Sequence, residues 1–175
     1  MDVRVPVYIG NQAIPEFIRY CKQHGLKEIL LVADENTYPA LGKAVEDALH
    51  RVGMDLVTVV LKGQEVQANE HYLVRLLLSY DLKPRTFLAV GSGTITDITR
   101  FVSHRTGRDF ISLPTAPSVD GFTSPSASLS MGRLKQTIQA QPPVAVFADL
   151  ATLCSAPLLM IADGFGDILG KYTSP

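Results

Sequence analysis

The sequence predicts an α/β protein, with a Rossmann-like, largely parallel sheet, flanking helices and one β-hairpin. Two observations support this prediction. Apolar runs of strand length alternate with helical patterns, which is typical of parallel sheets joined by helical crossovers. One of these runs, Thr86 to Val90, passes through Gly91-Ser-Gly93 directly into a helical pattern. A strand that turns through small residues into a helix is the local arrangement of many phosphate-binding sites.

Composition limits the class of protein. The 175 residues are 46% hydrophobic and 19% charged, with a net charge of −1, which suits one domain with a sizeable core. A chain so close to neutral has no strong positive potential to attract nucleic acid or anionic lipid. No apolar run approaches membrane-spanning length. We therefore expect no nucleic-acid partner and no membrane partner. Cys21 and Cys154 lie far apart without a CxxC pattern, so we expect reduced core thiols in a cytoplasmic protein.

The first elements follow from local patterns. Weak alternation from Val3 to Ile9 predicts a strand, and Asn11 can cap a helix that runs to about His24. Glu28 to Ala33 is a continuous apolar run, as expected of a strand that is buried on both faces of a parallel sheet.

A turn, Asp34 to Pro39, separates this strand from a helix that ends near Gly53. Leu56 to Leu61 predicts the next strand. The polar stretch Lys62 to Asn69 then leads into another helix, whose apolar positions are Leu73, Leu76, Leu77 and Tyr80.

The glycine turn begins the next unit. The helix after it has four apolar positions on one face: Ile95, Ile98, Phe101 and Val102. Asp109 to Leu113 predicts a short strand. Ala127 to Ser130 and Leu134 to Ile138 flank Met131-Gly132-Arg133, which indicates a hairpin.

The last part of the chain contains one more strand and two helices. Val144 to Ala148 is apolar, and Asp149 can cap a short helix that ends near Pro157. Pro157 to Tyr172 predicts a helix that is apolar on most of its surface. Such a helix needs something to pack on it, so we expect the chain to be incomplete or oligomeric.

Three loops follow predicted strands at the carboxyl edge of the sheet, where ligands bind in open α/β folds. They are Asp34 to Thr37, Gly91 to Asp97 and Pro114 to Ser126. In Gly91 to Asp97 the helix start offers free backbone N–H groups to an anion, and Thr94 and Asp97 stand at capping-box spacing. Alternatively, the glycines only let the strand and the helix pack closely.

The other two loops carry polar side chains. Asp34 can accept hydrogen bonds from a ribose, or it can cap the turn. Six residues between 115 and 126 can bind a polyol, a ribose or a nicotinamide amide: Thr115, Ser118, Asp120, Thr123, Ser124 and Ser126. Alternatively, this segment is an ordinary surface loop.

Gly164-Phe-Gly-Asp167 interrupts the last apolar helix. Each glycine costs about 1 kcal/mol relative to alanine, which suggests close approach of another backbone or a ligand. On such a helix Asp167 is costly to bury unless it is paired or bound to a cation. The four histidines show no ligand spacing with Asp167, so we expect them to be solvated surface residues.

Three segments together resemble a known family. They are Val-Gly-Ser-Gly-Thr-Ile-Thr-Asp (90–97), Leu-Pro-Thr-Ala-Pro-Ser-Val-Asp-Gly-Phe-Thr-Ser (113–124) and Ala-Asp-Gly-Phe-Gly-Asp-Ile-Leu-Gly-Lys-Tyr-Thr-Ser (162–174). In this order and spacing they closely resemble glycerol-1-phosphate dehydrogenases, of the iron-containing alcohol dehydrogenase and dehydroquinate synthase-like superfamily. The resemblance implies a metal-dependent, NAD(P)-linked reduction of dihydroxyacetone phosphate to sn-glycerol 1-phosphate.

The resemblance also implies residue roles. NAD or NADP would be bound by Asp34, Gly91, Gly93, Thr94, Ile95, Thr96, Asp97, Thr115, Ala116, Pro117, Ser118 and Ser124. Asp34 would favour NAD. Asp120 and Asp167 would be catalytic and would bind the substrate, and Asp167 would also bind a divalent metal, which could be Zn, Ni or Fe. Candidates for the substrate's phosphate are Arg133, Lys135 and Lys171, although these are also ordinary solvated charges.

Family members are about twice this length, and their second, helical domain supplies two histidines to the metal. We therefore expect the N-terminal half only, with a dinucleotide-binding domain in 1–156, the first helix of a truncated domain in 157–175, and an incomplete metal site. The all-helical C-terminal domain would be missing, or a homo-oligomer would cover the exposed helix. Alternatives are a non-catalytic nucleotide-binding remnant, a glycerol dehydrogenase, or a dehydroquinate synthase-like lyase, which the lack of a suitable set of lysines and arginines disfavours.

Overall fold

The computed structural model describes residues 4–132 and 134–173. The strands are β1 (Val7–Gly10), β2 (Glu28–Asp34), β3 (Asp55–Leu61), β4 (Thr86–Gly91), β5 (Phe110–Pro114), β6 (Ser126–Met131), β7 (Leu134–Gln139) and β8 (Ala145–Asp149). The helices are α1 (Ala13–Gln23), the π-helix η1 (Tyr38–Gly42), α2 (Lys43–Arg51), α3 (Glu70–Ser79), α4 (Gly93–Arg105), the 3-10 helix η2 (Gly121–Thr123), α5 (Leu150–Cys154) and α6 (Leu158–Thr173).

Six strands form one sheet in the order β1-β8-β5-β4-β2-β3, and every neighbouring pair is parallel. β6 and β7 pair antiparallel as a separate hairpin. The predicted parallel α/β sheet with a hairpin is therefore confirmed. The central strands β4 and β5 are buried along their whole length, because helices cover both faces of the sheet.

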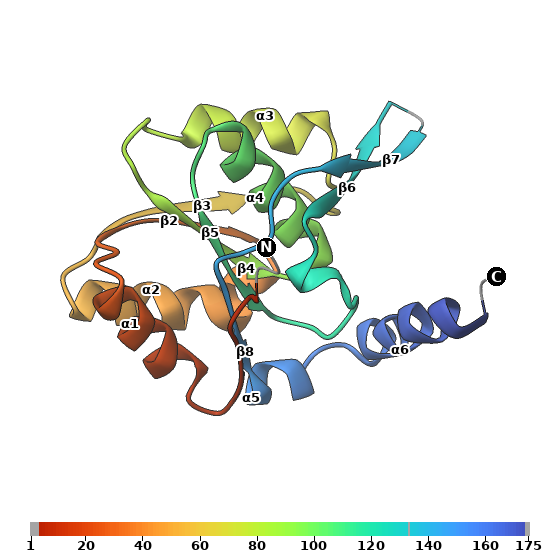
Figure 1. The fold of residues 1–175 in the computed structure, drawn as a ribbon, viewed down its shortest axis with the longest axis horizontal. Helices are drawn as coiled ribbons and strands as arrows, with labels where there is room; N and C mark the ends of the chain where they lie inside the picture. The colour runs from red at the N-terminus through yellow and green to blue at the C-terminus, as the bar shows by residue number, and fades with distance from the viewer. Residues whose placement is uncertain (1–3, 133, 174–175) are drawn as a thin grey trace.

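Helices pack on both faces of the sheet (Figure 1). One apolar core joins α1 and α2 to one face, with Phe17 and Leu49 among its buried side chains. The other core joins α3, α4 and the hairpin to the opposite face, with Leu76, Ile98 and Leu129. The two cores share alternate residues of the same strands, as the period-2 alternation of side chains requires.

The neighbouring strands β2 and β4 lead to helices on opposite faces of the sheet. After β2 the chain continues through α2, which lies on one face, whereas after β4 it continues through α4, which lies on the other. In open α/β sheets a crevice forms where neighbouring strands lead to opposite faces, and ligands bind there. The loops that begin after Asp34 and Gly91 flank this point of the sheet.

Some local predictions were correct and others were not. Asp149 does cap α5, because its Oδ2 accepts a hydrogen bond from the N–H of Thr152 at 2.9 Å. Asn11 does not cap α1, whose N-cap position is Gln12 and has no side-chain cap bond. The first strand begins at Val7; Val3, where we expected its start, lies outside the described residues.

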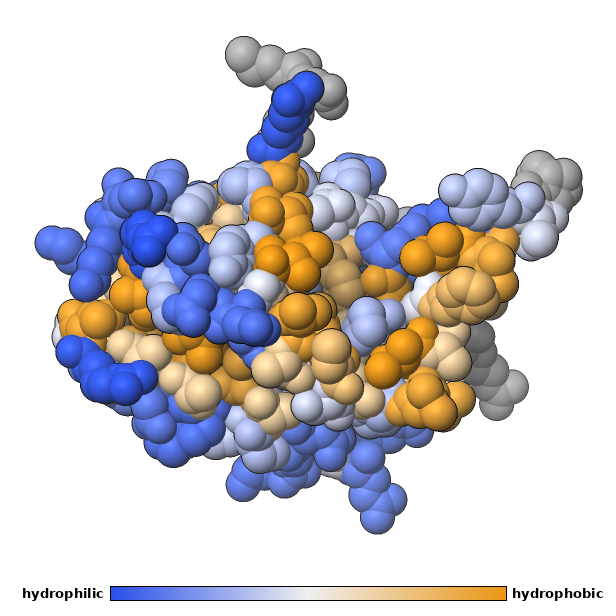
Figure 2. Space-filling view, turned by 90° about the horizontal axis from the view of Figure 1, so that it is seen from below, coloured by the Kyte–Doolittle hydropathy of each residue, from blue (hydrophilic) through white to orange (hydrophobic). Residues whose placement is uncertain are grey.

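The last helix, α6, is apolar and exposed, as predicted. In Figure 2 orange atoms gather at the right of the molecule, where Figure 1 places α6. Leu158, Leu159 and Tyr172 are 80%, 73% and 85% exposed. No helix in residues 4–132 and 134–173 is long and apolar enough to cross a membrane.

Candidate functional site

The three predicted loops do meet at the carboxyl edge of the sheet, since β5, β4 and β2 are parallel neighbours. Two hollows open there, one on each side of the start of α4. The first has a volume of about 670 Å³ and is lined by Asp34, Asn36, Thr37, Ala40, Ser92, Thr115, Ala116, Ala151, Thr152, Ser155, Ala156, Pro157 and Met160.

The second hollow has a volume of about 620 Å³. It is lined by Glu65, Val66, Gln67, Ala68, Gly93, Thr94, Thr96, Asp97, Arg100, Val119, Asp120, Gly121, Phe122, Ser124, Ser126, Ser128, Ser130, Lys135, Thr137 and Asp167. Because Ser92 lines the first hollow and Gly93 the second, the N-terminus of α4 separates them. Among the described residues, four of the predicted cofactor contacts line neither hollow: Gly91, Ile95, Pro117 and Ser118.

Two parts of the second hollow were not anticipated from the sequence. The loop between β3 and α3 contributes Glu65 to Ala68. The hairpin contributes the polar members of each strand, such as Ser128 and Thr137, which pair across it, while Ala127 and Leu129 point into the core. The alternation of Ser with Ala or Leu in residues 126–131 is the sequence signal for a hairpin with one polar face.

The N-terminus of α4 is available to an anion. The first intrahelical bond runs from the N–H of Thr96 to the carbonyl oxygen of Ser92, so the N–H groups before Thr96 have no partner within the helix. The predicted capping box is wrong, because the Asp97 carboxylate bonds to Arg100 and to the N–H of Ser128 instead. This leaves the first turn of a 13-residue helix with its positive dipole end facing the hollows.

The glycines of this turn also serve close packing, the alternative interpretation of the motif. A Cβ on Gly91 would lie 2.5 Å from the Cβ of Ile95, which is fully buried. A Cβ on Gly93 would lie 3.1 Å from a methyl carbon of Val119, an exposed side chain that can give way. The strand-to-helix turn is therefore sterically tight at Gly91 and less so at Gly93.

Asp34 caps its own turn. Its Oδ1 accepts hydrogen bonds from the N–H of Asn36 at 2.9 Å and of Thr37 at 2.7 Å. The Asp34 N–H in turn donates to Thr37 Oγ1 at 3.0 Å. These bonds occupy one carboxylate oxygen and direct the side chain at the first hollow, where the second oxygen can accept bonds from a ligand.

Asp97 and Arg100 form a buried ion pair on α4. Their Oδ1 and Nη1 atoms are 2.5 Å apart, and the side chains are 20% and 2% exposed. Burial raises the pKa of Asp97, an effect that the Arg100 charge opposes, and burial lowers the pKa of Arg100. The hydrogen bond between the two side chains and their shared burial fix the position of both on α4.

Asp120 and Asp167 come together although they are distant in the sequence. The Asp120 N–H donates to Asp167 Oδ2 at 3.0 Å, and Lys171 forms an ion pair with the Asp120 carboxylate. A hydrogen bond from Lys171 holds the pKa of Asp120 below its usual range, and the same bond raises the pKa of Lys171. Asp167 is exposed on α6, so the cost of burying its carboxylate does not arise among the described residues.

The described residues do not build a complete metal centre. Within residues 4–132 and 134–173, no group of three or more His, Cys, Asp or Glu side chains could hold a metal ion. Catalytic zinc sites normally use three protein ligands, whereas Asp167 offers one carboxylate that already accepts a hydrogen bond.

Of the candidate phosphate contacts, Lys135 lines the second hollow and Lys171 is engaged with Asp120. Arg133 lies outside the described residues. Cys21 is a buried thiol as expected, but Cys154 is exposed near the end of α5 and is not a core residue.

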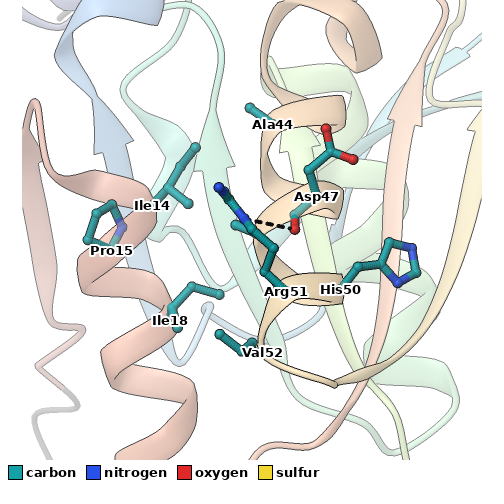
Figure 3. Close-up of a pocket in the computed structure, with 9 residues that line it drawn as sticks. Ile14, Pro15, Ile18, Ala44, Asp47, His50, Arg51 and Val52 are labelled. Carbon is teal, nitrogen blue, oxygen red and sulfur yellow. Dashed lines mark hydrogen bonds between the residues drawn. The ribbon is translucent and has the colours of Figure 1, made fainter.

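A third hollow lies between α1 and α2 and has a volume of about 1020 Å³ (Figure 3). Figure 3 shows Ile14 and Ile18 of α1 facing Arg51 of α2, whose Nε donates to the Asp47 carbonyl oxygen at 3.3 Å. None of the predicted site residues lines it. It shares no lining residue with the two hollows at the carboxyl edge, and the polar groups among its described lining residues do not converge on one point.

Known proteins match this chain over most of its length. The sequence pattern of the iron-containing alcohol dehydrogenases matches residues 8–157. The chain is 45% identical over 169 residues to an NAD(P)+ glycerol-1-phosphate dehydrogenase of Halalkalibacterium halodurans, covering 95% of this chain and 42% of that protein. It is 36% identical to the enzyme of the same name from Pyrococcus furiosus, covering 99% of this chain and 49% of that protein.

Solved structures share the fold. A 2-deoxy-scyllo-inosose synthase, solved with carbaglucose-6-phosphate, NAD+ and Co2+, superposes with a TM-score of 0.80 at 16% identity, over 93% of this chain and 47% of that one. The chain spans less than half the length of the curated relatives named above.

Proposed function

We propose, from the premise that this chain belongs to the iron-containing alcohol dehydrogenase family, that it is the cofactor-binding half of an NAD(P)-dependent glycerol-1-phosphate dehydrogenase. The reaction is the reduction of dihydroxyacetone phosphate to sn-glycerol 1-phosphate, with hydride from the reduced cofactor. One observation carries the proposal: two hollows at the carboxyl edge of the sheet are separated only by the N-terminus of α4. A dinucleotide has this form, with two nucleosides joined by a pyrophosphate.

In this proposal the first hollow takes the adenosine half of the cofactor. The free oxygen of Asp34 accepts from the ribose hydroxyls, and its negative charge disfavours the 2′-phosphate of NADP. Thr115 and Ala116 form the neighbouring wall. The cofactor is therefore NAD in preference to NADP.

The pyrophosphate lies on the start of α4. The N–H groups of the first turn, from Gly93 to Ile95, bind its oxygens, and Gly91 permits the tight turn before them. Thr96 and Asp97 shape the second hollow from the next turn of the helix. Pro117 and Ser118 contribute by holding the loop that borders both hollows, since neither lines one directly.

The second hollow takes the nicotinamide half and the substrate. Ser124 contacts the nicotinamide side, whereas Asp120 and Asp167 bind substrate hydroxyls. Their role is to hold the carbonyl carbon at reacting distance from the nicotinamide, which removes much of the entropic cost of the reaction. Lys171 keeps the Asp120 carboxylate ionised, so that it accepts hydrogen bonds.

We also propose that Asp167 supplies one ligand of a divalent metal, which is zinc, nickel or iron. The described residues do not fit a whole metal site, so its other ligands come from elsewhere in the assembled enzyme. We assign 1–156 to the dinucleotide-binding domain and 157–175 to the first helix of a helical part. The exposed apolar surface of α6 supports this division, because that helix needs a partner, either in the same enzyme or in a second copy.

The proposal is tested with a fusion of the 175-residue chain to the helical metal-binding domain of the Halalkalibacterium halodurans relative. We expect the metal-loaded fusion to oxidise NADH with dihydroxyacetone phosphate as the substrate. The Asp167→Asn variant of the fusion should still bind NADH but should lose turnover. A fusion that binds NADH and metal without turnover favours a non-catalytic remnant. Turnover of dihydroxyacetone but not of its phosphate favours a glycerol dehydrogenase.

A further inference from the structure

We propose that Arg100 is a positioning residue, which fixes the loop that carries Asp120 and Ser124 against the helix that holds the cofactor phosphates. That the site binds NADH rests on the proposed function above. Arg100 was not among the site residues anticipated from the sequence, because its partners lie between 3 and 26 residues away along the chain.

One guanidinium joins several segments of the second hollow. Arg100 Nη1 donates to Asp97 Oδ1 at 2.5 Å and to the Ser126 carbonyl oxygen at 3.0 Å. Its Nη2 donates to the carbonyl oxygens of Gly121 at 2.9 Å and Phe122 at 3.0 Å. Arg100 thus connects α4, η2 and the start of β6 through a single rigid group.

The loop that Arg100 fixes contains two of the three proposed contacts of the second hollow, Asp120 and Ser124. Asp120 immediately precedes Gly121, and Ser124 lies between Phe122 and Ser126. Asp97 Oδ2 accepts a hydrogen bond from the N–H of Ser128, which adds the hairpin to the same network. A shift of the guanidinium therefore displaces the nicotinamide side of the site as a unit.

The position demands arginine. The side chain is 2% exposed and lies over the ring of Phe110, with 5.6 Å between Cζ and the ring centroid. Burying a charge there is costly unless its donors are satisfied; both Nη atoms have partners, whereas Nε has none among the described residues. The planar guanidinium reaches four acceptors from two nitrogens in a fixed fork, whereas a lysine ammonium has three donors and a different reach. Lysine would keep the charge and lose the fork.

The fold contains a matched control. Arg85 is also 2% exposed, and it bridges the carboxylates of Asp55 and Asp81 and the carbonyl oxygen of Ile29. These residues lie at the amino ends of β2, β3 and β4, the opposite end of the sheet from the two hollows. Replacing Arg85 by lysine breaks a comparable buried network without touching the site.

The experiment compares Arg100→Lys and Arg85→Lys in the 175-residue chain, with urea unfolding to measure the loss of stability of each. Calorimetric titrations with NADH and with ADP measure the two halves of the site. We expect Arg100→Lys to weaken NADH binding about tenfold or more, as loss of charged hydrogen bonds does, and to change ADP binding less than about twofold. Arg85→Lys is expected to change neither affinity.

Equal losses of NADH affinity in both variants overturn the inference, and so do parallel losses of NADH and ADP affinity in Arg100→Lys. Unchanged NADH affinity in Arg100→Lys overturns it as well. If the unaltered chain binds neither NADH nor ADP, the proposed function fails, and amide hydrogen exchange decides the inference separately. Faster exchange in residues 118–128 of Arg100→Lys, absent in Arg85→Lys, supports the positioning role, and equal exchange overturns it.

Discussion

Gly164 of α6 lies directly against the carbonyl oxygen of Pro117, so closely that a Cβ on the glycine would be 1.7 Å from that oxygen. Gly164, Asp167 and Lys171 occupy one face of α6 at helical spacing, and the last two contact Asp120. The helix therefore docks on the loop between β5 and η2 through a single narrow face. Gly164 lowers helix propensity, but it permits this backbone contact.

Gly164→Ala is expected to displace α6 from the loop, because the added carbon meets a backbone atom that cannot swing aside. Hydrogen exchange of residues 158–173 should accelerate. Gly166→Ala is the control, since nothing lies within 4 Å of its Cβ position. That substitution should stabilise the helix by up to about 1 kcal/mol. Similar exchange in the two variants would contradict the docking contact.

The turn before α4 gives a second paired prediction. Gly91→Ala should lower the free energy of unfolding by about 1–3 kcal/mol, as overpacking does, because its Cβ would meet buried Ile95. It should also weaken NADH binding by displacing the helix start. Gly93→Ala should be milder in urea unfolding, since the exposed Val119 side chain can move. A larger stability loss in Gly93→Ala would be inconsistent with the packing described.

The two cysteines should differ in reactivity. Burial raises the pKa of the Cys21 thiol to about 12, and its side chain is inaccessible. Cys154 is exposed. A thiol reagent at neutral pH should therefore modify one cysteine in the folded chain and the second only in denaturant. Cys154→Ser should abolish the fast reaction; a fast reaction that survives in this variant would place Cys21 at the surface.

The ion pairs of Arg85 with Asp55 and Asp81 should make the stability of the fold depend on pH. Hydrogen bonds from Arg85 to Asp81, and from Lys83 and Arg85 to Asp55, hold the pKa of each carboxyl below its usual range. Groups with lowered pKa stabilise the fold above the unfolded pKa of about 3.9, and this contribution disappears as the pH falls through the folded pKa. The difference in thermal midpoint between the natural chain and Asp81→Asn should thus shrink below about pH 4. A difference that is independent of pH would contradict this.

Most of the fold followed from local sequence patterns. Strands such as β2, β4 and β8 are continuous apolar runs, and the parallel sheet buries them on both faces. The hairpin followed from two runs around Gly132, which has a φ of +61°. Caps were less predictable, because Asp97 bonds to the Arg100 side chain and, across 31 residues, to the N–H of Ser128 rather than to a backbone N–H of its own helix.

The residues that line the two hollows were anticipated where motifs lie in single loops, and missed where tertiary packing brings them together. The loops after Asp34 and Gly91 meet because their strands are neighbours, a consequence of topology. Glu65 to Ala68 reach the second hollow only through the packing of α3 and the hairpin, and their sequence carries no motif. In the sequence Arg100 is indistinguishable from any other arginine on a helix. Only the structure shows the four acceptors that its guanidinium contacts.

The most direct test of the cofactor site is a calorimetric titration of the 175-residue chain with NADH, with NADPH for comparison. We predict saturable binding of one NADH per chain and weaker binding of NADPH, because the Asp34 carboxylate repels a 2′-phosphate. Absence of saturable binding of either cofactor would contradict the assignment of the two hollows and the α4 N-terminus to a dinucleotide.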